Sequence, residues 1–240
     1  MRQHVTIVTG ASRGVGRATA VELSRRGGAV AIVARDQTDL AETARLCEAA
    51  GGTCLARRAD ITSESDLSGV AQKVVDTFGG IDGVVNNAGY APQAGVEETG
   101  AALFDRTLAV NLTAAMTLSR LAWPHLRQSG AAGRRPVIVN VSSMSAIDPL
   151  PGFVAYAAAK AGLLGLTRAL AREGDAEGIR SVAIILGGVE TAMFRGLKGV
   201  EGVPTEALLT PEEAGHAIAE CLLGPFAYGS GEGIYLRKRI

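Results

Sequence analysis

Apolar residues recur along this chain in short runs rich in valine, isoleucine and alanine. The first run reads HVTIVT and the second reads AVAIVA, and a glycine or a charged residue follows each. Runs of four to eight β-branched and apolar residues, bounded by turn residues, are typical of buried β-strands. On this pattern we expect strands at residues 4–9, 29–34, 53–59, 81–86, 136–142, 179–186 and 233–236.

Between these runs the apolar residues follow the period of a helix instead. Ser63 is a favourable N-cap residue and Pro211 suits a first helical turn, while the pair Gly51-Gly52 favours a helix end. These signals predict helices at residues 14–27, 38–50, 63–78, 99–128, 153–175 and 211–223.

Strands and helices therefore alternate from one end of the chain to the other. Strands that are apolar on both faces are buried on both faces, as in a parallel sheet covered by helices. The sequence shows no linker, short repeat or low-complexity segment. We expect an α/β fold in a single domain over residues 1–240.

Composition narrows the function classes. The chain has 240 residues, 47% of them hydrophobic, and its 24 basic and 24 acidic residues cancel. A neutral chain gives no indication of nucleic-acid binding. Cys47, Cys54 and Cys221 lack metal-ligand or redox spacing, so we assign no metal. Without a signal-peptide pattern or an apolar run of membrane length, we expect a soluble cytoplasmic protein with no membrane partner.

Tyr156 and Lys160 are the first candidates for chemistry. They lie four residues apart in an alanine-rich helical segment, so their side chains should share one face. A nearby ammonium group stabilises phenolate and should lower the tyrosine pKa from about 10, which suits proton exchange with an alcohol or ketone. The pair is common on ordinary helices. However, the chain has only four lysines against twenty arginines.

A glycine-rich turn joins the first strand to the first helix. Thr9–Gly16 reads TGASRGVG, with glycines spaced G-x-x-x-G-x-G. Such glycines let a pyrophosphate approach the backbone, and the helix N-terminus offers free N–H groups to it. A simple strand-to-helix turn is the alternative interpretation. If the turn binds a dinucleotide, we expect the contacts from Gly10, Ser12, Arg13, Val15 and Gly16.

The end of the second strand indicates which dinucleotide would bind. An acidic residue there would favour NAD, but the sequence reads Ala34-Arg35-Asp36. Arg35 can hold a ribose 2′-phosphate through its fork of donors, and Arg13 can close on the same group. We expect the side chain of Asp36 to start the next helix. The sequence thus predicts NADP(H) in preference to NAD(H).

Three further motifs carry a family resemblance. The sequence NNAG, residues 86–89, closes the fourth strand, Asn111 follows in VNL, and Ser143 lies thirteen residues before Tyr156. Together with the glycine turn and Tyr156-x-x-x-Lys160, these motifs resemble the short-chain dehydrogenase/reductase family in its compact branch. The resemblance covers nearly the whole chain. It implies a Rossmann-type, doubly wound, seven-stranded parallel sheet, and hydride transfer between NAD(P) and an alcohol or carbonyl.

The same resemblance implies roles for single residues. Tyr156 would be the general acid in reduction, and Lys160 would lower its pKa and hold the nicotinamide ribose. Ser143 would bind the substrate oxygen, and Asn111 would fix a water that relays protons to Lys160. Ser142 and Ser145 are rivals to Ser143, which its spacing to Tyr156 favours. Further cofactor contacts would be Asp60, Ile61, Asn87, Ala88, Gly89, Gly187, Val189 and Thr191.

Some positions have structural interpretations or depart from the family pattern. The structural interpretation of Asn86 is that it ties strands together, and we expect Asp82 to cap a turn. Leu186 stands where the family usually has proline, and Val182 stands where it often has asparagine. The chain ends in IYLRKRI, unlike many family tetramers, although the resemblance still implies a homo-oligomer, either a dimer or a tetramer.

Three apolar loops, 90–100, 144–153 and a lid at 190–209, should shape a pocket for a partly apolar ketone or alcohol. Our leading hypothesis is an NADPH-dependent carbonyl reductase. A narrower form of it is a 3-oxoacyl-thioester reductase of fatty-acid or polyketide synthesis, which the sequence also resembles. A non-catalytic dinucleotide sensor or scaffold is the alternative from another class. A sugar-nucleotide epimerase would need an extra substrate domain.

Overall fold

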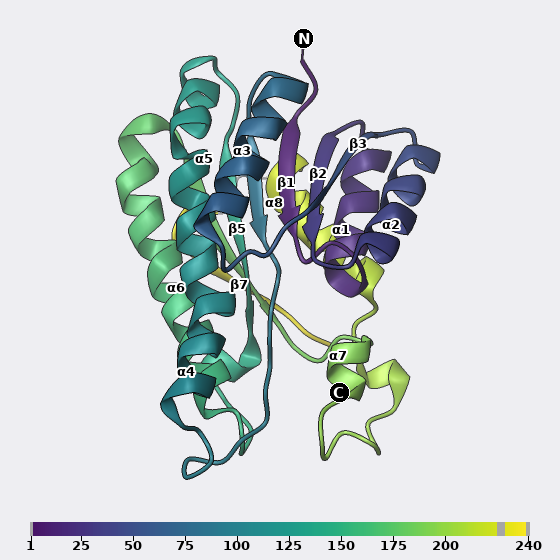
Figure 1. The fold of residues 1–240 in the computed structure, drawn as a ribbon, viewed down its shortest axis with the longest axis vertical. Helices are drawn as coiled ribbons and strands as arrows, with labels where there is room; N and C mark the ends of the chain where they lie inside the picture. Colours follow the sequence, from purple (N-terminus) through teal and green to yellow (C-terminus); the bar gives the residue numbers. More distant parts are fainter. Residues whose placement is uncertain (1, 225–228, 239–240) are drawn as a thin grey trace.

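Seven parallel strands form a single sheet in the computed structural model, which describes residues 2–224 and 229–238 (Figure 1). The strand order is β3-β2-β1-β4-β5-β6-β7, and each neighbouring pair is parallel. The order reverses between β1 and β4, which is where doubly wound sheets bind their ligands. The strands are β1 Val5–Thr9, β2 Ala29–Ala34, β3 Thr53–Arg58, β4 Gly83–Asn86, β5 Val137–Ser143, β6 Arg180–Leu186 and β7 Gly233–Leu236.

Helices cover both faces of this sheet. Helices α1 (Gly14–Arg25), α2 (Gln37–Ala49) and α8 (Pro211–Leu223) pack on one face. On the other face lie α3 (Glu64–Phe78), α4 (Ala101–Leu108), α5 (Ala114–Ala131) and α6 (Val154–Gly174), seen in Figure 1 as the layer opposite α1 and α2. Among the described residues, no helix combines the length and the apolar character that crossing a membrane requires.

The core confirms the expected burial on both faces for the inner strands, whereas the edge strands β3 and β7 are only partly buried. Every residue of β1, β2 and β4 is buried, and two apolar clusters sandwich the sheet. One cluster joins Leu23, Leu40 and Ile218 to the strands, and the other joins Leu67 and Leu118 to them. Val182, at a position where the family often has asparagine, belongs to the first cluster, which accounts for its apolar side chain.

The helical region expected at 99–128 is not one regular α-helix. It consists of α4 and α5 joined by a π-helical segment, Ala109–Thr113, with Asn111 at its centre. Such π-segments occur often at functional sites. Short helices fill the remaining loops: Met144–Ala146, Asp175–Glu177, α7 Ala192–Arg195 and Thr205–Ala207.

Ser63 and Asp36 begin their helices as predicted, and Thr210 is a further cap that we did not predict. Ser63 accepts a hydrogen bond from the Asp66 N–H, and Asp36 accepts one from the Asp39 N–H. Thr210 forms a full capping box with Glu213 ahead of Pro211. These local bonds fix where three of the helices begin.

Asp82 does more than cap a turn, which corrects our expectation. Its buried carboxylate accepts hydrogen bonds from the Val5 N–H (2.8 Å), the Ser129 hydroxyl (2.6 Å) and the guanidinium groups of Arg2 and Arg134. Burial alone would raise the pKa of Asp82, but the bonds from Ser129 and Val5 outweigh it and lower the pKa. The network ties the amino ends of β1 and β4 to α5, opposite the edge that carries the candidate site.

Candidate active site

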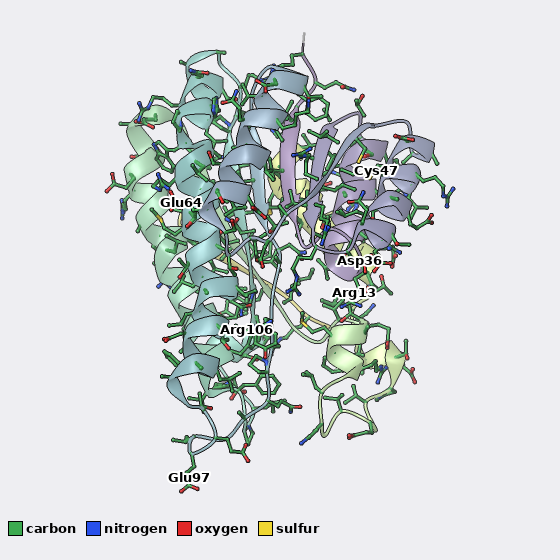
Figure 2. All side chains as sticks on the ribbon, in the orientation of Figure 1. Arg13, Asp36, Cys47, Glu64, Glu97 and Arg106 are labelled. Atoms are coloured by element: carbon green, nitrogen blue, oxygen red, sulfur yellow. The ribbon has the colours of Figure 1, made fainter. Side chains whose placement is uncertain are left out.

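The predicted site residues gather at the carboxyl edge of the sheet. Most of them lie at or after the ends of β1 to β6, which point to the same edge because all the strands are parallel. Figure 2 shows Arg13 and Asp36 just beyond the ends of the strands near α1 and α2, and Arg106 across from them on α4. Parallel packing has thus brought together residues from distant parts of the chain.

The glycine turn after β1 interlocks with the loop after β4. The Thr9 hydroxyl accepts hydrogen bonds from the backbone N–H groups of Asn87 and Ala88, both at 3.1 Å. The Asn87 side chain donates to the carbonyls of Thr9 (2.9 Å) and Gly10 (3.2 Å). The two loops therefore form one rigid unit at the point where the strand order reverses.

Two glycines are required by close contacts in this turn. Gly10 has a φ of +64°, and a Cβ there would lie 2.7 Å from the Ala88 Cα. A Cβ at Gly16 would lie 2.3 Å from the Gly10 carbonyl oxygen. Any larger residue would push the turn away from the loop after β4. The glycines therefore let the two backbones pack closely and leave the turn open to a ligand.

The first turn of α1 fits a phosphate group. Arg13 is the N-cap residue, with extended backbone and no side-chain capping bond, so the first N–H groups of the helix carry no cap. An uncapped N-terminus presents those donors and the positive end of the helix dipole to an anion. Ser12 and Val15 flank these donors at half-buried positions. The donor set, with the glycine cradle beside it, fits a dinucleotide pyrophosphate.

Cationic side chains lie at the end of β2, where the adenosine ribose of a dinucleotide is expected. Arg35 is exposed there, and Arg58 lies opposite Ala34 in the β2–β3 register and donates to the Arg35 carbonyl at 3.2 Å. Asp36 is occupied as the cap of α2, as we expected. Within residues 2–224 and 229–238, the side chains of Arg13 and Arg35 form no ion pair.

Asp60 and Ile61 follow β3 at the same edge of the sheet. The Asp60 carboxylate accepts hydrogen bonds from the Thr62 N–H (2.9 Å) and the Thr62 hydroxyl (2.8 Å), and these bonds lower its pKa. Ile61 lines a small cavity with Thr9, Asn86, Ala88 and Asn111. The Asn86 side chain donates to the Asn140 side chain at 2.8 Å and to the Ser119 hydroxyl at 3.3 Å. It therefore ties β4 to β5 and to α5, which agrees with the structural interpretation of this residue.

Tyr156, Lys160 and Ser143 lie together beyond the end of β5. The Lys160 Nζ is 5.5 Å from the centre of the Tyr156 ring, which confirms that the two side chains share one helix face. Lys160 is buried and donates to the Val141 carbonyl at 2.7 Å. The Ser143 hydroxyl lies near enough to the Tyr156 phenol to lower its pKa. Ser142 is buried and donates to the Lys160 carbonyl of α6 at 3.1 Å.

The tyrosine pKa shifts against our expectation. Burial raises the pKa of Tyr156 to about 12, and the hydrogen bond from Ser143 only partly opposes it. Burial also lowers the pKa of Lys160 to about 8. Removing either group from water disfavours its charged form, and burial is the largest cause of both shifts. At neutral pH the phenol is protonated and the lysine carries its charge.

Asn111 is held by its neighbours. Its side-chain oxygen accepts from the Tyr90 N–H at 3.2 Å, and its amide group donates to the Tyr90 carbonyl (2.8 Å) and the Thr107 carbonyl (2.9 Å). The Cβ that a side chain would place at Gly89 lies 3.3 Å from the Asn111 oxygen. The Asn111 side chain therefore holds the main chain of the loop after β4 in place.

The segment after β6 returns toward the glycine turn. The Gly187 N–H donates to the Leu236 carbonyl at 2.9 Å, and Val189 is buried and bridges to Leu209. Thr191 caps α7, and its Cγ2 lies 3.3 Å from the position of a Cβ at Gly14. Leu186, at the position of the family proline, is buried at the end of β6. Thr191 thus lies directly against the glycine turn.

Sequence reasoning missed two residues that the fold places here. Thr9 ends a strand and locks two loops with its hydroxyl, although a polar residue ending an apolar run was a visible signal. Arg58 becomes a neighbour of Arg35 only through the β2–β3 register. A strand ending in Arg57-Arg58 suggests an exposed basic end, but not which residue it faces.

Known proteins share the sequence pattern of this chain. The profile of the short chain dehydrogenase family matches residues 4–200. The chain is 35% identical to cis-4-hydroxycyclohexanecarboxylate dehydrogenase of Sinomonas cyclohexanicum over 90% of this chain and 88% of that protein. It is 37% identical to 2-(R)-hydroxypropyl-CoM dehydrogenase of Xanthobacter autotrophicus over 79% and 76% of the two chains.

A solved structure gives the same result. The 3-ketoacyl-(acyl-carrier-protein) reductase of Brucella melitensis, complexed with NADH, superposes with a TM-score of 0.90 at 30% sequence identity. The match covers 98% of this chain and 97% of the reductase. A doubly wound sheet, an interlocked glycine turn and a Tyr–Lys pair at its carboxyl edge therefore agree with the sequence matches, and the chain is an oxidoreductase that belongs to the short-chain dehydrogenase family.

Proposed function

We propose that this protein uses NADPH to reduce a ketone or other carbonyl to an alcohol, reversibly, with Tyr156 as the general acid and base. The observation that carries the proposal is the position of the Tyr156 phenol. It lies beside Ser143, on the same helix face as Lys160, and at the sheet edge that also holds the dinucleotide-fitting turn. That combination provides a proton donor, a polar group for an oxygen atom and a place for a cofactor.

The side chains divide the chemistry among them. Bound NADPH would supply the hydride. The Ser143 hydroxyl would hold the carbonyl oxygen of the substrate and steady the negative charge that develops on it. Tyr156 would give its proton to that oxygen, and the Lys160 charge would stabilise the phenolate that results. The protonated phenol and charged lysine found at neutral pH are the forms that reduction requires.

Asn111 would support proton return to this pair. All of its side-chain amide atoms are engaged with Tyr90 and Thr107, so we propose that its main-chain carbonyl, in the π-helical segment, holds the relay water. The assignment keeps the role that the family resemblance implies and places it on the backbone.

The cofactor preference rests on charge at the end of β2. Arg35 is exposed with Arg58 next to it, while the adjacent acid, Asp36, is bound to the start of α2. Two guanidinium groups favour a ribose 2′-phosphate through charge-assisted hydrogen bonds, and an occupied carboxylate is poorly placed to bind a 2′-hydroxyl. We therefore propose NADP(H) over NAD(H), although a related reductase was solved with NADH.

The substrate would be partly apolar. Ile147, Leu150 and Met193 are exposed on the loops that follow β5 and β6. A 3-oxoacyl thioester is the second candidate, and the similarity to the 3-ketoacyl-(acyl-carrier-protein) reductase favours it. The other relatives named above are dehydrogenases of small hydroxy compounds. Assembly into a dimer or tetramer and a cytoplasmic location stay predictions.

Substrate assays test the proposal directly. We expect purified protein to oxidise NADPH, followed by its absorbance, in the presence of at least one class among cyclic ketones, aliphatic ketones and acetoacetyl thioesters. Faster turnover of the thioesters than of simple ketones would select the 3-oxoacyl reductase. Dinucleotide binding without turnover across all three classes would point to the sensor or scaffold instead.

The pH dependence of reduction should follow Lys160. Because the pKa of Lys160 is lowered to about 8 and that of Tyr156 is raised to about 12, both groups are protonated below pH 8. Above that pH the lysine loses its charge first, so we expect kcat/KM for reduction to fall about tenfold per pH unit as the pH rises. Lys160→Arg keeps the charge and should remove this limb. A flat profile for the unaltered enzyme up to pH 10 would contradict the assignment.

A further inference from the structure

Gln93 spans the gap between two loops that are far apart in the sequence. Its side-chain oxygen accepts a hydrogen bond from the Lys198 N–H at 2.6 Å, and its amide group donates to the Lys198 carbonyl at 3.1 Å. The side chain thus satisfies both main-chain groups of one residue, as a neighbouring strand would. We call these two bonds the clasp.

The clasp joins the two sides of the site. Gln93 lies in the loop that leaves β4 after Gly89, and Lys198 lies in the lid that follows β6. In Figure 1 these segments extend beyond the carboxyl edge of the sheet, the first below β4 and α4 and the second around α7. A third segment is connected too, because the Ala94 N–H donates to the Gly152 carbonyl at 2.8 Å. All three predicted substrate loops are therefore linked.

The lid has its own internal brace. The Arg195 guanidinium pairs with the Glu190 carboxylate, donates to the Val203 carbonyl at 2.7 Å and bonds the Thr205 hydroxyl at 3.1 Å. These bonds hold the lid segment together without contacting the opposite loop. Gly199 follows Lys198 with a φ of +83°, a conformation that glycine adopts readily. The lid can therefore move as a unit about its ends once the clasp opens.

The two ends of the lid make different contacts. Near β6, Thr191 meets Gly14 of the phosphate-binding turn, and Met193 lies 3.9 Å from a Cβ position at Gly89. The Thr191 contact belongs to the proposed cofactor side, and neither contact involves Gln93. The clasp lies beyond them, toward the loops whose apolar residues would face the substrate. It should therefore affect substrate retention more than cofactor affinity.

We propose that Gln93 is a positioning residue that holds the lid closed over the bound substrate through the main chain of Lys198. This inference rests on the proposed reductase function and extends it to the substrate loops. Gln93 acts through the lid and touches no reacting atom. A glutamine is needed because one side chain must accept and donate at once, and asparagine is shorter by one methylene.

Kinetics of Gln93→Ala test the proposal. Two solvent-exposed hydrogen bonds contribute on the order of 1 kcal/mol in total, so KM for the carbonyl substrate should rise about fivefold. The kcat should stay within about twofold, and the Kd for NADPH likewise, because the groups that transfer the proton and hold the dinucleotide are unchanged. Gln93→Glu keeps the acceptor, so its KM should lie between those of the unaltered protein and Gln93→Ala. The KM of Gln93→Asn should resemble that of Gln93→Ala.

Limited trypsin digestion gives a readout that needs no activity. Trypsin cleaves after Lys198, whose N–H and carbonyl the clasp engages, so the intact protein should resist cleavage there. Gln93→Ala should be cut at that bond about fivefold faster, in line with the same loss of hydrogen bonds. Cleavage sites are identified by mass spectrometry. If no carbonyl is reduced, the proposed function fails, but the digestion still tests the clasp.

Gln72→Ala is the matched control. Gln72 donates to Asp76 on an exposed turn of α3 and has no contact with the lid. It should match the unaltered protein in both KM and cleavage. The proposal is overturned if Gln93→Ala leaves KM and cleavage after Lys198 unchanged, if Gln72→Ala changes them equally, or if Gln93→Ala weakens NADPH binding as much as it raises KM.

Discussion

Replacing Tyr156 with phenylalanine should lower kcat for carbonyl reduction by about 10³-fold and leave the Kd for NADPH within about threefold. The change removes only the phenolic oxygen, which is the proposed proton donor. The ring would keep its edge contact with Phe153 and its position near Lys160, so the fold of α6 should persist. Steady-state kinetics and fluorescence titration with NADPH measure the two quantities.

Tyr235→Phe provides the control for this substitution. Tyr235 is 55% exposed on β7 and lies outside the proposed catalytic and cofactor contacts, so the same chemical change there should leave kcat within about twofold. Turnover of Tyr156→Phe close to that of Tyr235→Phe would remove Tyr156 from its assigned role. A parallel loss of NADPH binding in Tyr156→Phe would instead assign the residue to the cofactor site.

Replacing Arg35 with alanine should reduce the preference for NADPH over NADH by about 10- to 100-fold, the range expected when a charge-assisted hydrogen bond of about 1.5–3 kcal/mol is lost. The effect should fall on kcat/KM with NADPH, because only NADPH carries the 2′-phosphate. The value with NADH should change little. Paired measurements with both cofactors on the same protein preparation give the ratio.

Substitutions at two other arginines provide a second test and a control for the Arg35→Ala experiment. Arg58→Ala should lower the NADPH preference by a smaller factor, because Arg58 already donates to the Arg35 carbonyl. Arg45→Ala removes an exposed arginine that pairs with Glu42 on α2, and it should leave the ratio unchanged. Equal losses with both cofactors in Arg35→Ala, or an unaltered enzyme that uses NADH as well as NADPH, would contradict the proposed preference.

The elements that were predictable share a local cause. The second strand and the helix at 211–223 begin and end where the pattern placed them, because a continuous apolar run and a capping threonine before proline act over neighbouring residues. The π-helical segment at Asn111 was not predictable. Its distinguishing interactions are hydrogen bonds to Tyr90, twenty-one positions away, which no local pattern records.

The site shows the same division at the level of single residues. The four-residue spacing of Tyr156 and Lys160 was enough to place both side chains on one helix face. The direction of the tyrosine pKa shift was wrong, because burial depends on which elements cover the phenol and not on its neighbour along the helix. Gln93 stood out in no motif, and its partner lies 105 positions away.

The sequence by itself determined the alternation of strands and helices, the glycine turn and the helical spacing of the Tyr–Lys pair, since each arises from backbone preferences and side-chain period over a few residues. Only the tertiary structure decided that burial dominates the charge states of Tyr156 and Lys160, that Arg58 joins Arg35, and that Gln93 reaches the lid. Those features depend on strand register, on desolvation and on loops meeting across the sheet edge, and such long-range effects exist only once the chain has packed.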